Sequence, residues 1–209
     1  MAMPNRRSQF EFDLSGGNPC LDFANTVSGR KDPEGLIDHI NRYADLVVFA
    51  EQSRLISSQQ SDDLLARAQR NGSDANRALQ RSIALRASVF GAFSAIADGK
   101  SASQHDLRRI EEAALQALRH RKLAGTNGRY QWEWEAGGKD SLDRPMWPIA
   151  QAAAELLTSG ELRGVRECEA PTCAWLFLDQ SRNHSRRWCD MKVCGNRQKA
   201  RRHYQRTHV

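Results

Sequence analysis

Apolar residues recur at three- and four-residue steps along much of the chain, which is the period of an amphipathic helix. The segments that follow this period are 36–47, 59–70, 74–97, 103–118 and 146–159. Ser103, with Asp106 three residues later, resembles a capping box at the start of the fourth segment. Gly160 ends the last one. The pattern therefore predicts a mainly helical body.

Two short segments alternate between apolar and polar residues instead, with the period of a β-strand. They are FEFDL at 10–14 and RYQWEWE at 129–135. We expect each to form a strand and the two to pair with one another. The body is then mainly α with a small β element.

The helical pattern ends at Gly160, and the composition changes to ELRGVRE before the first of four clustered cysteines. We place a domain boundary here. The sequence predicts a helical N-terminal domain over 1–162, which could bind an effector or form a dimer, and a small cysteine-containing module over 163–209.

The positive charge of the chain belongs to this module. The whole chain carries a formal net charge of +6. Residues 181–209 hold nine Lys/Arg and one acid, Asp190, so the remaining residues hold 22 bases and 24 acids. This asymmetry favours a nucleic acid or another acidic partner for the C-terminus.

The composition also limits the class of protein and its cellular location. No window reaches the ~18 uncharged apolar residues that a membrane-spanning helix needs. The start MAMPNRRSQFEFDL has no apolar stretch after its arginines, so we expect no signal peptide and a cytoplasmic location. In that compartment clustered cysteines favour metal binding over disulfides.

Four cysteines have the spacing C-x4-C-x15-C-x4-C, and they are Cys168, Cys173, Cys189 and Cys194. Two close pairs joined by a longer loop suit a tetrahedral Zn²⁺ site, in which each pair supplies two thiolates. A closed four-cysteine site stabilises the fold and has no position open for catalysis. An iron–sulfur cluster, two disulfides and free buried thiols remain alternatives. The fifth cysteine, Cys20, is distant in sequence and is expected in the core.

A basic stretch follows the last cysteine. If 196–207 is helical, steps of about 100° place Lys199, Arg202 and Arg206 on one side. Ala200 and Tyr204 fall on the opposite side, which could pack on the metal module. A helix of this length fits the DNA major groove. The other candidate DNA contacts are Arg182, Arg186, Arg187, Asn196 and Arg197. The alternative is a solvated charged face.

The C-terminal run LFLDQSRNHSRRWCDMKVCGNRQKARR resembles the CGNR zinc-finger family, whose name matches Cys194-Gly195-Asn196-Arg197. The N-terminal GGNPCLDFANTV and the pair Leu85-Arg86 resemble the ABATE domain that accompanies this finger in bacterial proteins. The resemblance implies a stress-induced transcription regulator with four cysteine metal ligands. It also favours duplex DNA over RNA as the partner.

Three polar residues of the body match the ABATE pattern and lie among apolar neighbours: Asp22, Asn25 and Arg86. One interpretation is a pocket for a small-molecule effector. The other is local hydrogen bonding, with an internal Asp22–Arg86 ion pair and Asn25 capping a helix.

The sequence therefore predicts a zinc-dependent DNA-binding transcription regulator in the bacterial cytoplasm, on the nucleoid when bound to DNA. A homodimer is needed if the DNA site is palindromic. The alternative is an adaptor whose finger binds an acidic protein or RNA. We expect no enzyme, because there is no nucleophile–base pair, no phosphate-binding glycine loop and no open metal site.

Overall fold

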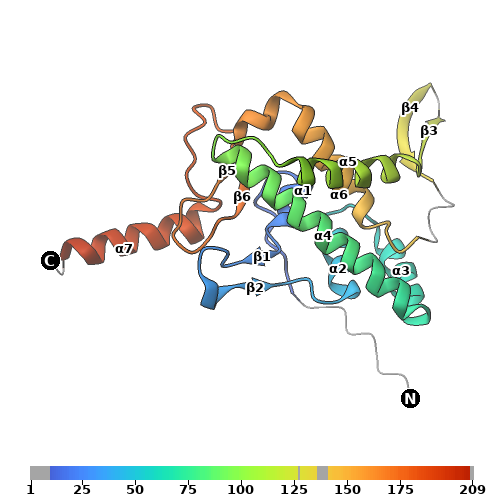
Figure 1. Cartoon of the computed structure of the whole chain (residues 1–209), viewed down its shortest axis with the longest axis horizontal. Helices are drawn as coiled ribbons and strands as arrows, with labels where there is room; N and C mark the ends of the chain where they lie inside the picture. Colours follow the sequence, from blue (N-terminus) through green and yellow to red (C-terminus); the bar gives the residue numbers. More distant parts are fainter. Residues whose placement is uncertain (1–9, 127, 136–140, 208–209) are drawn as a thin grey trace, which may run out of the picture.

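The computed structural model describes residues 10–126, 128–135 and 141–207, and its helices surround one long central helix, α4 (Figure 1). The helices of the N-terminal part are α1 (Pro19–Ala24), α2 (Tyr43–Gln52), α3 (Ser58–Arg70), α4 (Gly72–Ala97), α5 (Gln104–Leu118) and α6 (Met146–Thr158). Short 3₁₀ helices, η1 (Pro33–Gly35) and η3 (Gly160–Gly164), lie between them. The expected mainly helical fold is confirmed.

Within the described residues, three two-stranded antiparallel sheets complete the fold. Their strands are β1 (Val27–Ser28) with β2 (Ile37–Asp38), β3 (Arg121–Thr126) with β4 (Arg129–Trp134), and β5 (Val165–Glu167) with β6 (Leu176–Leu178). The C-terminal part ends in a helical turn, η4 (Met191–Gly195), and in α7 (Asn196–Thr207). In Figure 1, α7 and the β3–β4 hairpin extend from opposite ends of the molecule.

The core lies where α1, α4, α5 and α6 meet. Its largest fully buried side chains include Phe23 on α1, Phe93 on α4 and Ile149 on α6. The expected cap of α5 is present, because Ser103 Oγ accepts the amide hydrogen of Asp106 at 3.1 Å. Cys20 is fully buried, as predicted.

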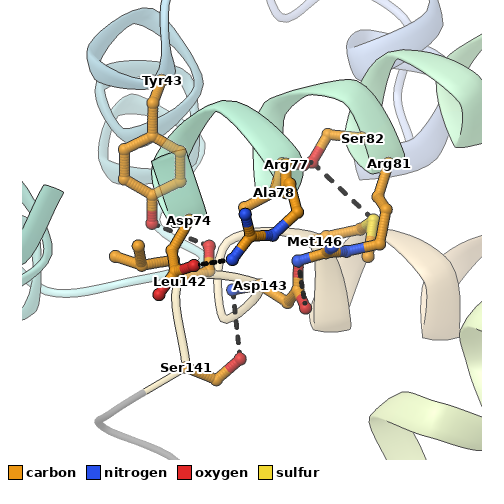
Figure 2. Close-up of polar contacts among 10 residues, drawn as sticks. All are labelled: Tyr43, Asp74, Arg77, Ala78, Arg81, Ser82, Ser141, Leu142, Asp143 and Met146. Atoms are coloured by element: carbon orange, nitrogen blue, oxygen red, sulfur yellow. Dashed lines mark hydrogen bonds and ion pairs between the residues drawn. The ribbon is translucent and has the colours of Figure 1, made fainter. Parts of the chain in front are cut away.

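Polar contacts attach α4 to the loop that leads into α6 (Figure 2). Arg81 donates to Asp143 through both Nε and Nη2, at 3.0 and 2.8 Å. Tyr43 donates its hydroxyl to the carbonyl of Leu142 at 2.7 Å, and Ser82 on α4 contacts the sulfur of Met146. These bonds fix the start of α6 against the central helix.

The predicted pairing of 10–14 with 129–135 is wrong. Residues 10–14 have no strand structure, and β4 pairs with β3 instead, from Arg121↔Trp134 to Thr126↔Arg129. One side chain takes up two of the backbone groups of this segment: Gln52 accepts from the Phe12 amide at 2.9 Å and donates to the Phe10 carbonyl at 2.8 Å.

The helix predicted from Leu36 starts only at Tyr43, and Ile37 belongs to β2. Asp45 explains the later start, because its carboxylate accepts the amide hydrogen of Arg42 at 2.9 Å and caps the helix there. Leu36 and Ile37 are more than half exposed, so they follow the helical period without joining the core.

The strands of the C-terminal part are packed into the helical core. Val165, Leu176 and Leu178 are buried in the same cluster as the helices, whereas Phe177 faces a second small cluster around the cysteines. The β5–β6 hairpin therefore has one face on each part of the protein. Among the described residues, no helix combines the length and apolar character needed to cross a membrane.

Candidate metal centre and nucleic-acid interface

The first pair of cysteines is positioned by the β5–β6 hairpin. Cys168 directly follows β5, and its amide donates to the carbonyl of Trp175 at 2.8 Å. Cys173 lies in the connecting turn and donates from its amide to the carbonyl of Ala170 at 3.1 Å. Both thiols therefore project from a turn that the backbone itself holds.

Of the second pair, Cys189 lies two residues before η4 and Cys194 lies within it. Asp190, next to Cys189, caps this turn by accepting the amide hydrogen of Val193 at 3.0 Å. Gly195 follows Cys194 in a tight space, because a Cβ there would lie 2.6 Å from the sulfur of Met191. Its φ is not positive, so close packing rather than an unusual backbone angle explains the glycine.

The four sulfur atoms converge on one point. All lie within 4.8 Å of one another. The Cys189 sulfur is 3.7 Å from that of Cys173 and 3.6 Å from that of Cys194. A tetrahedron with Zn–S bonds of about 2.3 Å has edges of about 3.8 Å, so these separations fit zinc. They are too long for disulfides, whose S–S bond is about 2.05 Å.

Two protein-family models match the chain. The ABATE model, described as "Putative stress-induced transcription regulator", matches residues 17–160, and the CGNR zinc-finger model matches residues 165–207. The chain belongs to the ABATE family. Its C-terminal module is a CGNR zinc finger. Comparison with curated proteins gives no match.

The four thiols also affect one another's pKa values. Hydrogen bonds from the Cys173 and Cys189 thiols lower the pKa of Cys168. Burial, together with the negative charge of Cys168, raises the pKa of Cys194. Four thiolates this close together repel one another, and a bound metal ion offsets that repulsion. The CGNR finger therefore holds one structural Zn²⁺, and the four cysteines fill its coordination.

The ABATE domain holds the finger through Asn25, at the end of α1. Its side-chain Nδ2 donates to the carbonyl of Leu176 on β6 at 2.8 Å, and its Oδ1 accepts the amide hydrogen of the same residue at 2.8 Å. The backbone of Gly16 adds a third bond to β6, from the amide of Leu178, at 2.8 Å.

A second set of contacts joins the two parts on the β5 side. Lys31 forms an ion pair with Glu167 at 2.8 Å and donates to the carbonyl of Cys168 at 3.1 Å. Ser94 on α4 donates to the other oxygen of Glu167 at 2.6 Å. Sequence reasoning missed these residues, because they are far apart in sequence and no local motif marks them.

Asp22 and Arg86 do not form the internal ion pair that the sequence suggested. Asp22 accepts the amide hydrogen of Gly16 at 2.7 Å, and burial raises its pKa to about 7. Arg86 instead pairs with Asp38 on β2, at 2.8 Å, and donates to Thr26 at 2.9 Å. Asp22, Asn25 and Arg86 are each bonded within the fold, and an effector pocket around them stays a prediction.

The loop between the cysteine pairs contains three predicted DNA-binding arginines with different surroundings. Arg186 lies 4.4 Å from the centre of the Phe177 ring and donates to the carbonyls of Trp188 and Cys189. Arg187 forms an ion pair with Glu169. Arg182 is exposed, and no contact of its side chain is described. Arg186 is thus part of the finger's own framework.

Helix α7 extends away from the body, and its described side chains are exposed except for Gln198, which is half-buried (Figure 1). The exposed residues include Asn196, Arg197 and Lys199. The prediction that Ala200 and Tyr204 pack on the metal module is wrong, since both are exposed and Tyr204 retains 63 % of its accessible surface. The side chains of Arg202 and Arg206 lie outside the described residues.

Arg197 faces the ABATE domain at the root of α7. It lines a cavity of about 320 Å³ together with Trp175 of the finger and with Asp13 and Asp32 of the ABATE domain. The cavity therefore lies between the two parts of the protein, beside the metal centre.

Proposed function

We propose that this ABATE protein is a DNA-binding transcription regulator whose zinc finger presents α7 to duplex DNA. The single observation that carries the proposal is the exposed helix α7, which projects from the metal-bound finger with five Lys/Arg and no acid between Asn196 and Thr207. A cationic helix of this length fits the major groove and contacts phosphates on both sides of it.

The exposure of α7 also favours a large partner. An isolated helix of twelve residues is only marginally stable in water. Like charges spaced three and four residues apart weaken α7 further. Phosphate groups offset that repulsion, so DNA binding stabilises the same helix that makes the contact.

The zinc ion serves this function indirectly. With four cysteine ligands it has no site for a substrate, and it orients the start of α7 through Cys194. We therefore propose a regulator without enzymatic activity that acts in the bacterial cytoplasm and is associated with the nucleoid when bound to DNA. The stress response named by the family is part of this proposal.

An adaptor that binds an acidic protein or RNA is the second candidate, favoured by the exposed Tyr204 among the cations of α7. The two functions differ in how strongly DNA binding depends on the DNA sequence. A DNA-binding regulator retains a sequence preference at high salt, whereas an adaptor binds DNA only weakly and without preference.

The test is a charge-reversed variant, K199E/R202E/R206E, in a DNA-binding assay by fluorescence anisotropy. A matched control, R54E/R70E/R108E, has the same change in net charge at exposed positions outside both the finger and the β3–β4 hairpin. The proposal predicts that the α7 variant loses binding, while the control binds nearly as the parent protein does and both retain one zinc per chain. Equal losses in both variants would contradict the assignment to α7.

A further inference from the structure

The β3–β4 hairpin projects from the ABATE domain. It extends beyond the end of α5 into solvent (Figure 1), and among the described residues its sheet has only these two strands. Its root is held by Trp134, whose ring lies 5.9 Å from that of Trp147 on α6. A lone two-stranded hairpin is marginally stable in water, so the outer part of this one needs a partner.

One face of the hairpin is apolar and exposed. Residues directly opposite in the register share a face, and Leu123 lies opposite Trp132. Leu123 is 62 % exposed, Trp132 59 % and Tyr130, on the same face, 75 %. Tyr130 leans over Gly125, where a Cβ would come within 2.6 Å of its ring. An aromatic face of this size, exposed on a projecting arm, is typical of an interaction surface.

Along the same part of β4, the outer edge of the strand has backbone N–H and C=O groups that point away from β3. The amide of Glu135 donates to the carbonyl of His120, which fixes the alternation of the ladder. Residues 129, 131 and 133 therefore bond to β3, and residues 130, 132 and 134 direct their N–H and C=O groups away from it. Within the described part of the chain, no bond to these outward groups is found. Such an edge pairs readily with another strand.

We propose that β4 pairs with β4 of a second copy of this chain, antiparallel and centred on Gln131. In this register Tyr130 exchanges backbone hydrogen bonds with Trp132 of the partner subunit, and the two copies of Gln131 lie side by side. The two hairpins become one four-stranded sheet, and the aromatic faces of both copies are continuous on one side of it.

The charged side chains of β4 favour a second copy of this chain as the partner. With Gln131 at the centre, Arg129 lies opposite Glu133 of the partner subunit, and the same pair occurs twice by symmetry. Opposite charges directly across a strand pair are favourable, and so are aromatic pairs. The edge of β3 lacks this property: its charged residues, Arg121 and Lys122, are both cations, so two β3 strands would repel each other.

The dimer leaves the proposed DNA-binding helix uncovered. The hairpin and α7 extend from opposite ends of the molecule (Figure 1), so the two fingers of the dimer lie at its far ends. The interface does not depend on DNA binding, and each of the two proposals can fail without the other.

The test is sedimentation equilibrium of the full zinc-loaded chain with variants of the exposed charges. R129E and E133K should each weaken the dimer at least about tenfold, because two attractive pairs become repulsive. Since Lys122 lies opposite Glu133 within the hairpin, the fully reversed set K122E/R129E/E133K restores both contacts and should restore the dimer. A monomeric parent protein, or a dimer that none of these changes affects, would overturn the proposal.

Cross-linking tests the register itself. Directly opposite residues that are not hydrogen-bonded have Cα atoms about 4.5 Å apart, which suits a disulfide. Gln131→Cys should therefore form an interchain disulfide under mild oxidation, and Ala124→Cys, on the same face of β3, should not. The parent protein, treated alike, reports any cross-linking through its native cysteines. Cross-linking at position 124 but not at 131 would exclude this register.

Discussion

The side chain of Asn25 makes two hydrogen bonds with the backbone of one residue, Leu176, which is 151 positions away in the sequence. Both residues are buried, at the junction of the ABATE domain and the CGNR finger. The amide of asparagine copies the pairing of a neighbouring strand, because it offers one donor and one acceptor side by side. The finger is thus held by the helical domain as an additional strand would hold it.

Asn25→Ala should lower the free energy of unfolding by about 2–4 kcal/mol, because it leaves a buried N–H and a buried C=O without partners. Urea unfolding, followed by tryptophan fluorescence, measures the loss. The exposed Asn41→Ala, which removes a single bond to the carbonyl of Asp38, serves as the control. A loss below about 0.5 kcal/mol for Asn25→Ala would show that these bonds do not hold the finger.

Asp22 should make the protein less stable as the pH rises. Its pKa of about 7 in the folded state exceeds the ordinary 3.8, so the folded state binds the proton more tightly. Its contribution is therefore full below pH 4 and is lost as the pH rises to about 7. Over this range the loss amounts to at most about 4 kcal/mol.

Asp22→Asn keeps an oxygen that can accept from Gly16 and removes the charge. The variant should match the parent protein in stability below pH 4, exceed it by a growing margin between pH 4 and 7, and keep that margin at pH 8. Chemical denaturation of both proteins at a series of pH values measures the difference. A constant difference across the series would mean that Asp22 does not titrate in this range.

Removal of a single metal ligand should remove the metal. Cys189→Ala is expected to contain no stoichiometric zinc by atomic emission and to lose the fold of the finger, because this small segment lacks a sufficient core of its own. Cys20→Ala also removes a buried thiol, but it should retain one zinc per chain. Stoichiometric zinc in Cys189→Ala would place the metal elsewhere.

Two arginines of the loop between the cysteine pairs should behave differently. Arg186→Ala should destabilise the finger by about 1–3 kcal/mol, because it frees two backbone carbonyls and uncovers Phe177. Arg182→Ala should leave stability unchanged and, if this loop contacts phosphates, should reduce the slope of DNA affinity against salt by about 0.9. Thermal unfolding and salt titrations separate the two effects. If both variants change thermal stability and salt dependence alike, Arg186 and Arg182 do not have different roles.

Much of the fold could be predicted from the sequence, because helices with a regular apolar period and a local cap are specified by neighbouring residues. Ser103 is one such cap. One error arose where a distant contact decides, because Gln52 bonds to the backbone of Phe10 and Phe12 in place of a strand partner. The other arose from a local cap, because Asp45 starts at Tyr43 a helix whose apolar period begins earlier.

The same distinction applies to the site. The four cysteines could be predicted as metal ligands because their paired spacing suits a tetrahedral site. The role of Asn25 was not evident, since its partner is a backbone group in another part of the chain. The prediction that the Ala200 side of α7 packs on the metal module was also wrong. Helical periodicity shows which residues share a side of a helix, but not whether another part of the protein covers that side.

Selection of random genomic fragments at several salt concentrations tests whether the zinc-loaded finger reads DNA through α7. We expect that one sequence motif is enriched, that its enrichment persists near physiological salt, and that K199E/R202E/R206E abolishes it. Binding without a motif, lost entirely as salt rises, would contradict this role of α7 and favour an acidic protein or RNA as the partner of the finger.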